Sequence, residues 1–149
     1  MSSRYGLSIR AANNGDADGL ATLLKTANTS LTPATLAARL HAMQDQPGAV
    51  LIADEWGPPS GLIAVHWHAV FSTDMKVGWI SALFVDPQRR RNGLARTLLK
   101  AASQAARSAG CGELLLSAQT GTSGLRAFCL ATGFEDAGSL LARPLRKRS

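Results

Sequence analysis

Residues 88–95, with the sequence Gln-Arg-Arg-Arg-Asn-Gly-Leu-Ala, form a pattern that suits an anion. They follow an apolar segment and open an amphipathic one, as at a turn from a strand to a helix. A helix N-terminus offers free N–H groups and a partial positive charge to a phosphate group. Gly93 and Ala95 would let the phosphate come close to the backbone, and the arginines add charge. The pattern predicts a phosphate site, with an ordinary turn carrying surface arginines as the alternative.

Two histidines and a cysteine are the candidate proton carriers. His66 and His68 lie two positions apart in an apolar segment, so a strand would point both to one face. Either could accept a proton near neutral pH, and a structural role for each is the alternative. Cys129 could donate a proton or could be a small buried residue. Because the histidines lack a third ligand apart from the remote His41, we expect no metal site.

Apolar periodicity and turn residues predict the elements that position these groups. Asp16 and Thr32-Pro33 are expected to begin the first two helices. Three successive apolar segments joined by short turns predict an antiparallel meander, which a helix, a strand and another helix follow. The expected strands span 7–10, 49–54, 62–70, 77–85, 114–117 and a segment within 139–143; the expected helices span 19–25, 33–43, 93–109 and 122–131.

The bulk composition favours one globular domain. The chain has 149 residues, of which 46% are hydrophobic and 17% are charged, as is typical of a folded domain. No apolar run approaches the roughly 18 to 20 residues of a membrane span, and the first residues lack the apolar stretch of a secretory signal. Cys111 and Cys129 do not form a CxxC pair, so we expect reduced thiols in a cytoplasmic protein.

The net charge of +6 also permits a nucleic-acid partner, because the arginine run and the basic segment 143–149 both suit a polyanion. The aromatic residues lie mostly in apolar segments and do not alternate with the basic ones. The chain therefore lacks the pattern of a surface that binds nucleic acid. The sequence contains no GxxxxGK[ST] and no GxGxxG, so neither a P-loop nor a dinucleotide fingerprint explains the turn. We read the basic segment as a solvated tail.

The pattern Val85-x-Pro87-x-x-Arg90-x-x-Gly93-x-Ala95 resembles the cofactor motif of the GNAT superfamily of N-acetyltransferases. In that motif, R/Q-x-x-G-x-G/A follows a V-x-P strand end. Gly133-Phe134, at the end of the last expected helix, resembles the family's glycine-phenylalanine pair. The resemblance implies one α/β domain over residues 1–149, with a central, mostly antiparallel mixed sheet and helices on both faces. It also implies transfer of an acetyl group from acetyl-CoA to a primary amine, by direct attack through a tetrahedral intermediate.

The resemblance further implies where the cofactor binds. The backbone of Leu83, Phe84 and Val85 would bind the pantetheine arm, and Thr122 stands where many members have an asparagine that could contribute. The pyrophosphate would be held by the residues of the turn, which are Arg90, Arg91, Asn92, Gly93, Leu94, Ala95 and Arg96.

Two positions leave the catalytic groups open. Cys129 stands where many family members have a tyrosine that protonates the CoA sulfur, and Ser81 stands where some have a carboxylate. The general base is therefore His66, His68 or water. The acceptor would be the amine of a small molecule, peptide or protein, in a pocket walled by about residues 28–33 and by the middle strands. Homodimers are common in the family. A non-catalytic module that binds acyl-CoA as a regulatory ligand is the alternative function.

Overall fold

The computed structural model describes residues 6–118 and 124–146. The contacts within the chain divide it into a first unit that ends at Leu116 and a second unit that begins at Ser117. Among the described residues, the first unit contains the sheet and three α-helices, and the second contains one α-helix.

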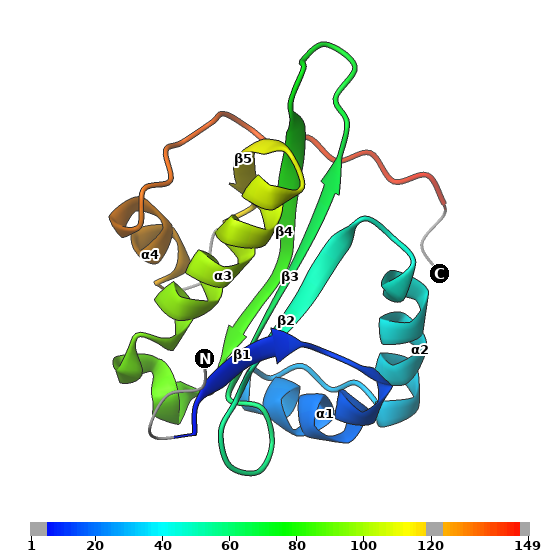
Figure 1. Ribbon diagram of the computed structural model, residues 1–149, viewed down its shortest axis with the longest axis vertical. Coiled ribbons are helices and arrows are strands. Elements are labelled where there is room, and N and C mark those ends of the chain that lie inside the picture. Colours follow the sequence, from blue (N-terminus) through cyan, green and yellow to red (C-terminus); the bar gives the residue numbers. More distant parts are fainter. Residues whose placement is uncertain (1–5, 119–123, 147–149) are drawn as a thin grey trace. The chain divides into compact units, whose positions relative to one another are not determined.

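A five-stranded sheet, in the order β1-β2-β3-β4-β5, forms the centre of the first unit (Figure 1). The first four strands pair antiparallel, and β5 pairs parallel with β4. Their bounds are β1 Ser8–Ala11, β2 Gly48–Asp54, β3 Gly61–His68, β4 Lys76–Val85 and β5 Cys111–Leu116. The predicted meander and the mixed, mostly antiparallel sheet are confirmed.

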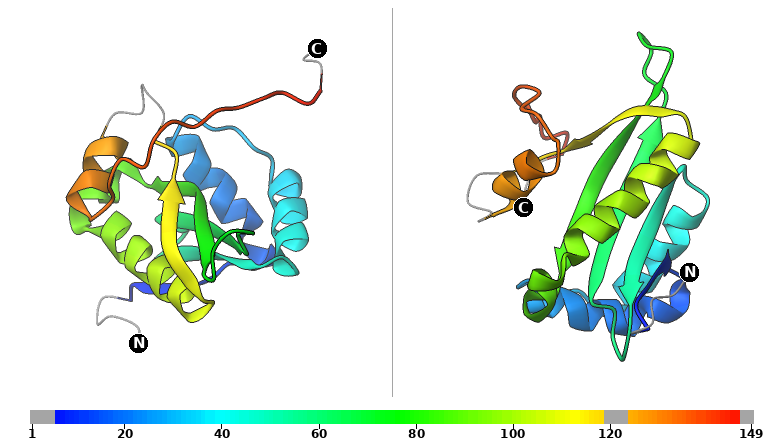
Figure 2. Two further views of the ribbon diagram at one scale, coloured as in Figure 1. Left: turned by 90° about the horizontal axis from the view of Figure 1, so that it is seen from above. Right: turned by 60° about the vertical axis from the view of Figure 1, so that its left-hand side comes forward.

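Helices cover both faces of this sheet, as Figure 2 shows in its left view. The helix α3 (Leu94–Ser108) packs on one face, where a Cβ added at Gly61 would lie 2.8 Å from the side chain of Leu98 and 3.4 Å from that of Leu94. Leu62, the next residue of β3, points to the opposite face because side chains alternate along a strand. There it joins the buried cluster of α1 (Ala17–Thr26) and α2 (Pro33–Gln44). The predicted α/β class is confirmed.

The two helices of that face begin differently. The α2 helix starts as predicted, because the Thr32 hydroxyl accepts a hydrogen bond of 3.1 Å from the Thr35 N–H. Asp16 is the N-cap residue of α1, as predicted, but its side chain makes no cap hydrogen bond to the helix. The Asp16 carboxylate instead accepts from the Asn13 N–H at 2.8 Å and pairs with the Arg10 guanidinium at 2.7 Å. The stronger charged partner on β1 thus competes with the helix for this carboxylate.

In the second unit, α4 (Leu125–Ala131) ends as predicted, since the Phe134 N–H donates to the Cys129 carbonyl at 3.0 Å. The predicted beginning of this helix at residue 122 lies outside the described residues. The strand predicted within 139–143 is wrong, because residues 134–144 form neither helix nor strand. A strand forms only where a neighbour pairs with its backbone, and Leu140 and Leu141 remain 61% and 92% exposed.

None of the helices in the described ranges has both the length and the apolar character that crossing a bilayer requires.

Candidate functional site

The end of β4 has a strand neighbour on one side. Its pairing with β5 stops at Ile80, opposite Leu116, whereas its pairing with β3 continues to Val85. In the described part of the chain, the stretch from Ser81 to Val85 therefore pairs with β3 alone. An edge of this kind presents alternating N–H and C=O groups to an extended ligand. Leu83, Phe84 and Val85 all lie on it.

A sharp turn follows this edge and leads into α3. Asp86 opens the 3-10 helix η2 (Pro87–Asn92), where its carboxylate accepts from the Gln88 N–H at 3.0 Å. Gly93 then takes the left-handed conformation, with φ +68°, and a Cβ built on it would meet no atom within 4 Å. The helix begins at Leu94, and the Thr97 N–H donates to the Gly93 carbonyl at 3.1 Å. The first-turn N–H groups, at Leu94, Ala95 and Arg96, have no helix carbonyl before them.

The arginines of the turn differ in their surroundings. Arg89 forms an ion pair of 2.7 Å with Glu55, which ties the turn to the segment between β2 and β3. Arg96 is exposed in the first turn of α3. The side chains of Arg90, Arg91 and Asn92 lie outside the described part of the structure, and so does Thr122.

A β-bulge places Ser81 beside His66. Ala64 lies opposite Ala82 and Val65 opposite Ile80, so Ser81 is the extra residue of β4. Its Oγ lies 2.7 Å from His66 Nε2, at hydrogen-bond distance. Bulges of this kind redirect side chains, and they are frequent beside active sites. The sequence pointed to His66 and to Ser81 separately, and the bulge brings them together.

Ser81 also lines a cavity of about 340 Å³ between the sheet and the helices α1 and α2, here called the apolar cavity. Its walls are leucines of the two helices, Leu31 and Met43, with Val50, Leu62, Ala82 and Phe84 of the sheet. The polar residues of the lining are Thr29, Arg39 and Ser81. The expected acceptor wall at residues 28–33 contributes Thr29 and Leu31, so the wall is less polar than the sequence indicated.

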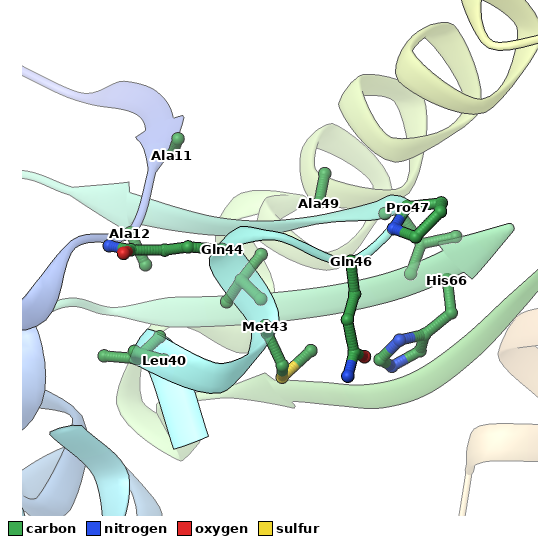
Figure 3. Close-up of a pocket in the computed structure, with 12 residues that line it drawn as sticks. Ala11, Ala12, Leu40, Met43, Gln44, Gln46, Pro47, Ala49 and His66 are labelled. Atoms are coloured by element: carbon green, nitrogen blue, oxygen red, sulfur yellow. The ribbon is translucent and has the colours of Figure 1, made fainter. Parts of the chain in front are cut away.

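A second cavity of about 230 Å³, here called the histidine cavity, contains His66. In Figure 3 the side chains of His66, Gln46 and Met43 point toward one another from β3, from the segment before β2 and from the end of α2. Met43 and Leu40 line both cavities. The hydrogen bond between Ser81 and His66 thus joins a group of the apolar cavity to a group of the histidine cavity.

The second histidine has different surroundings. His68 is exposed at the last position of β3, and neither cavity includes it. Within residues 6–118 and 124–146, no three His, Cys, Asp or Glu side chains gather as a metal ion would require.

Cys129 is buried in α4 of the second unit. Burial raises the pKa of its thiol above the ordinary value, because the thiolate would lose its hydration. The thiol is therefore protonated near neutral pH. Cys111, at the start of β5, is also a free, buried thiol whose pKa is raised by burial.

Sequence reasoning did not find Arg39 or the apolar cavity. The sequence did contain one signal for Arg39. It directly precedes Leu40, one of the apolar positions that predicted the second helix. The lining comes from α1, α2 and three strands, and no local pattern shows which of their side chains leave a space between them.

Residues 19–134 match the model of the acetyltransferase (GNAT) family. No curated protein is significantly similar to the chain.

Solved acetyltransferases share the fold at low sequence identity. An acetyltransferase of Trypanosoma brucei is 21% identical, with a TM-score of 0.78 over 93% of this chain and 99% of its own. AAC(6')-Iy, in complex with a bisubstrate analogue, CoA-S-monomethyl-acetylneamine, is 22% identical with a TM-score of 0.78, over 95% and 99%. An aminoglycoside acetyltransferase from an uncultured soil metagenomic sample, in complex with sisomicin, is 18% identical with a TM-score of 0.75, over 95% and 97%.

Proposed function

The chain belongs to the acetyltransferase (GNAT) family, and on that premise we propose that it transfers an acetyl group from acetyl-CoA to a primary amine. The amine nitrogen attacks the thioester carbon, and a tetrahedral oxyanion forms. The new C–N bond is kept while the C–S bond breaks. The nitrogen loses one proton, and the CoA sulfur leaves as a thiolate that takes up a proton. Holding both reactants in one site is itself a large part of the acceleration.

The observation that carries this proposal is the open edge of β4 next to the N-terminus of α3. The stretch from Ser81 to Val85 pairs with β3 alone, so Leu83, Phe84 and Val85 can bind the pantetheine amides as a neighbouring strand would. The left-handed Gly93 directs the chain into α3, where the N–H groups up to Ala95 suit a pyrophosphate. The backbone of Arg90, Arg91 and Asn92 belongs to the same proposed cradle, and Arg96 adds charge beside it.

We assign amine deprotonation to Ser81 and His66 together. Ser81 faces the apolar cavity, and its hydroxyl can accept the amine proton as it passes its own to His66 Nε2, 2.7 Å away. His66 can then release that proton through the histidine cavity. His68 has no such partner among the described residues, so we propose no step for it.

We assign protonation of the departing CoA sulfur to Cys129. Its position, four residues before Gly133, is the one at which the family often has a tyrosine. Burial keeps the thiol protonated near neutral pH, which a proton donor requires.

The test is calorimetric titration of acetyl-CoA into the protein, followed by measurement of CoA thiol release with a panel of amines. We expect saturable binding of acetyl-CoA, no comparable binding of ATP, and amine-dependent thiol release. Binding without turnover on any amine would favour the regulatory acyl-CoA-binding module. No binding of acetyl-CoA, together with salt-dependent binding of an oligonucleotide, would contradict the proposal and favour a nucleic-acid partner.

A further inference from the structure

The lining of the apolar cavity limits which amines it can hold. Leucines, Val50 and Phe84 account for most of its surface, and no acidic side chain lines it among the described residues. An acceptor with several ammonium groups would have to bury them without a counter-charge, which is costly. The cavity therefore suits an amine whose body is apolar.

Arg39, an exposed residue of α2, is the one charged residue of the described lining. It extends from α2 in the turn between Leu36 and Leu40, both of which also line the cavity. None of the four ion pairs formed by described residues includes Arg39. Its guanidinium is therefore available to a ligand, and a carboxylate is the group that it binds best, through two parallel hydrogen bonds.

Ser81 lies in the same lining but on β4, across from the helix that carries Arg39. The cavity thus combines an apolar body, a cation on α2 and a hydroxyl joined to His66 on the sheet. These three features match an acceptor with an apolar side chain, an anion and a primary amine.

We propose that the acceptor is a hydrophobic α-amino acid, whose carboxylate pairs with Arg39 while its amine lies at Ser81. This inference rests on the proposed acetyl transfer, and the product is an N-acetylamino acid. The C–N bond forms first, in the tetrahedral intermediate, and the thioester C–S bond then breaks. The amine proton leaves by way of Ser81 and His66, and the CoA thiolate takes up a proton.

The experiment measures kcat/KM by thiol release for L-leucine, L-leucinamide, 3-methylbutylamine and spermidine, with saturating acetyl-CoA. We expect L-leucine to exceed L-leucinamide by about tenfold or more, because a charge-assisted pair is lost in the amide. The amide has the larger fraction of free amine at neutral pH, so protonation cannot create this preference. Equal or faster turnover of spermidine or leucinamide would overturn the amino-acid assignment and leave acetyl transfer standing.

The variant Arg39→Ala should abolish the preference for leucine over leucinamide, so that leucine is turned over no better than 3-methylbutylamine, which has no carboxylate. Arg107→Ala, which removes an exposed arginine of α3 outside both cavities, is the matched control and should keep the preference. A preference that survives Arg39→Ala would contradict the proposed carboxylate site.

Titration of N-acetyl-L-leucine separates the two proposals. Binding that Arg39→Ala weakens by about tenfold supports the carboxylate site. If no amine is turned over in that case, only the proposal of acetyl transfer fails. If N-acetyl-L-leucine does not bind and leucine is not acetylated while another amine is, the amino-acid assignment fails alone.

Discussion

The turn between β4 and α3 is built mainly from chain neighbours, whereas the apolar cavity is built from distant segments. Asp86 caps Gln88 and Gly93 redirects the backbone before Leu94, all within one short stretch. The cavity instead needs α1, α2 and three strands to pack before its lining exists. The proposed cofactor side is therefore readable from a motif, and the proposed acceptor side can change with any of several elements.

This difference also suggests how the two sides can diverge. A glycine and a cap would maintain the proposed phosphate cradle whatever the rest of the domain binds. A leucine replaced on α1 or α2 alters the shape of the apolar cavity without touching that cradle. Substitutions on one side should therefore leave the function of the other side largely intact.

The largest expected effect is on the acceptor side. Ser81→Ala or His66→Ala should lower kcat by about a hundredfold, because a positioned proton acceptor contributes at least that much. Acetyl-CoA affinity, measured by calorimetry, should be unchanged in both variants. His41→Ala, an exposed histidine of α2, is the control and should keep the parent rate. If His66→Ala keeps full turnover, the proton leaves by another route.

The next effect is on the cofactor side. Gly93→Val should weaken acetyl-CoA binding by about tenfold or more, because a side chain would occupy the space beside the helix N-terminus. It should also lower the free energy of unfolding by at least about 1 to 2 kcal/mol, the cost of a left-handed residue with a side chain.

The matched control for that loss is Gly110→Val. Gly110 also has positive φ, +97°, and a Cβ built on it would meet nothing within 4 Å, but it follows α3 at its far end. The Gly110→Val variant should lose a similar amount of stability and keep the parent's affinity for acetyl-CoA. Equal affinities of the two variants would argue against the cradle at Gly93.

A smaller effect is expected at Cys129. Cys129→Ala should lower kcat by about tenfold or less. The leaving group is the CoA thiol, and an alkyl thiol like that of cysteine, with an ordinary pKa near 8.5, leaves readily without a proton donor. Affinity for acetyl-CoA should not change. Cys111→Ala removes another buried thiol and controls for lost packing. Identical rates in both variants would show that Cys129 only packs.

The smallest effect concerns the scaffold of the acceptor side. The hydrogen bond from Arg10 holds the pKa of the Asp16 carboxyl below its ordinary 3.8. The ionised carboxylate therefore stabilises the fold above about pH 4, and this stabilisation is lost as the pH falls through the lower, folded pKa. Asp16→Asn should lower the free energy of unfolding at pH 7 by about 1 kcal/mol.

Urea unfolding between pH 7 and about pH 2 checks this sign, because the variant should lose less stability on acidification than the parent. Asp18→Asn, which changes an exposed carboxylate of α1, is the control and should keep the parent's stability at pH 7. A parallel decline of parent and Asp16→Asn would mean that the ion pair contributes nothing.

The sequence alone determined the elements of the sheet and the turn that follows it. These elements are marked by local signals, which are the alternation of apolar residues, the proline at the start of α2 and the Gly133-Phe134 pair after α4. Each signal involves residues only a few positions apart, so the sequence alone shows it. Two details of the local expectations differ from the structure. The Asp16 side chain pairs with Arg10 of β1 and makes no cap hydrogen bond to α1, although Asp16 is its N-cap residue. The segment 139–143 is not a strand.

Only the tertiary structure decided which side chains meet. Ser81 and His66 are 15 residues apart, and a bulge in the pairing of β3 with β4 brings them to 2.7 Å. Arg39 lines the same cavity as Ser81 because α2 packs over the sheet. A bulge and a cavity both arise from how separate segments fit against one another. No single segment encodes that fit, because it depends on the volumes of all the side chains between them.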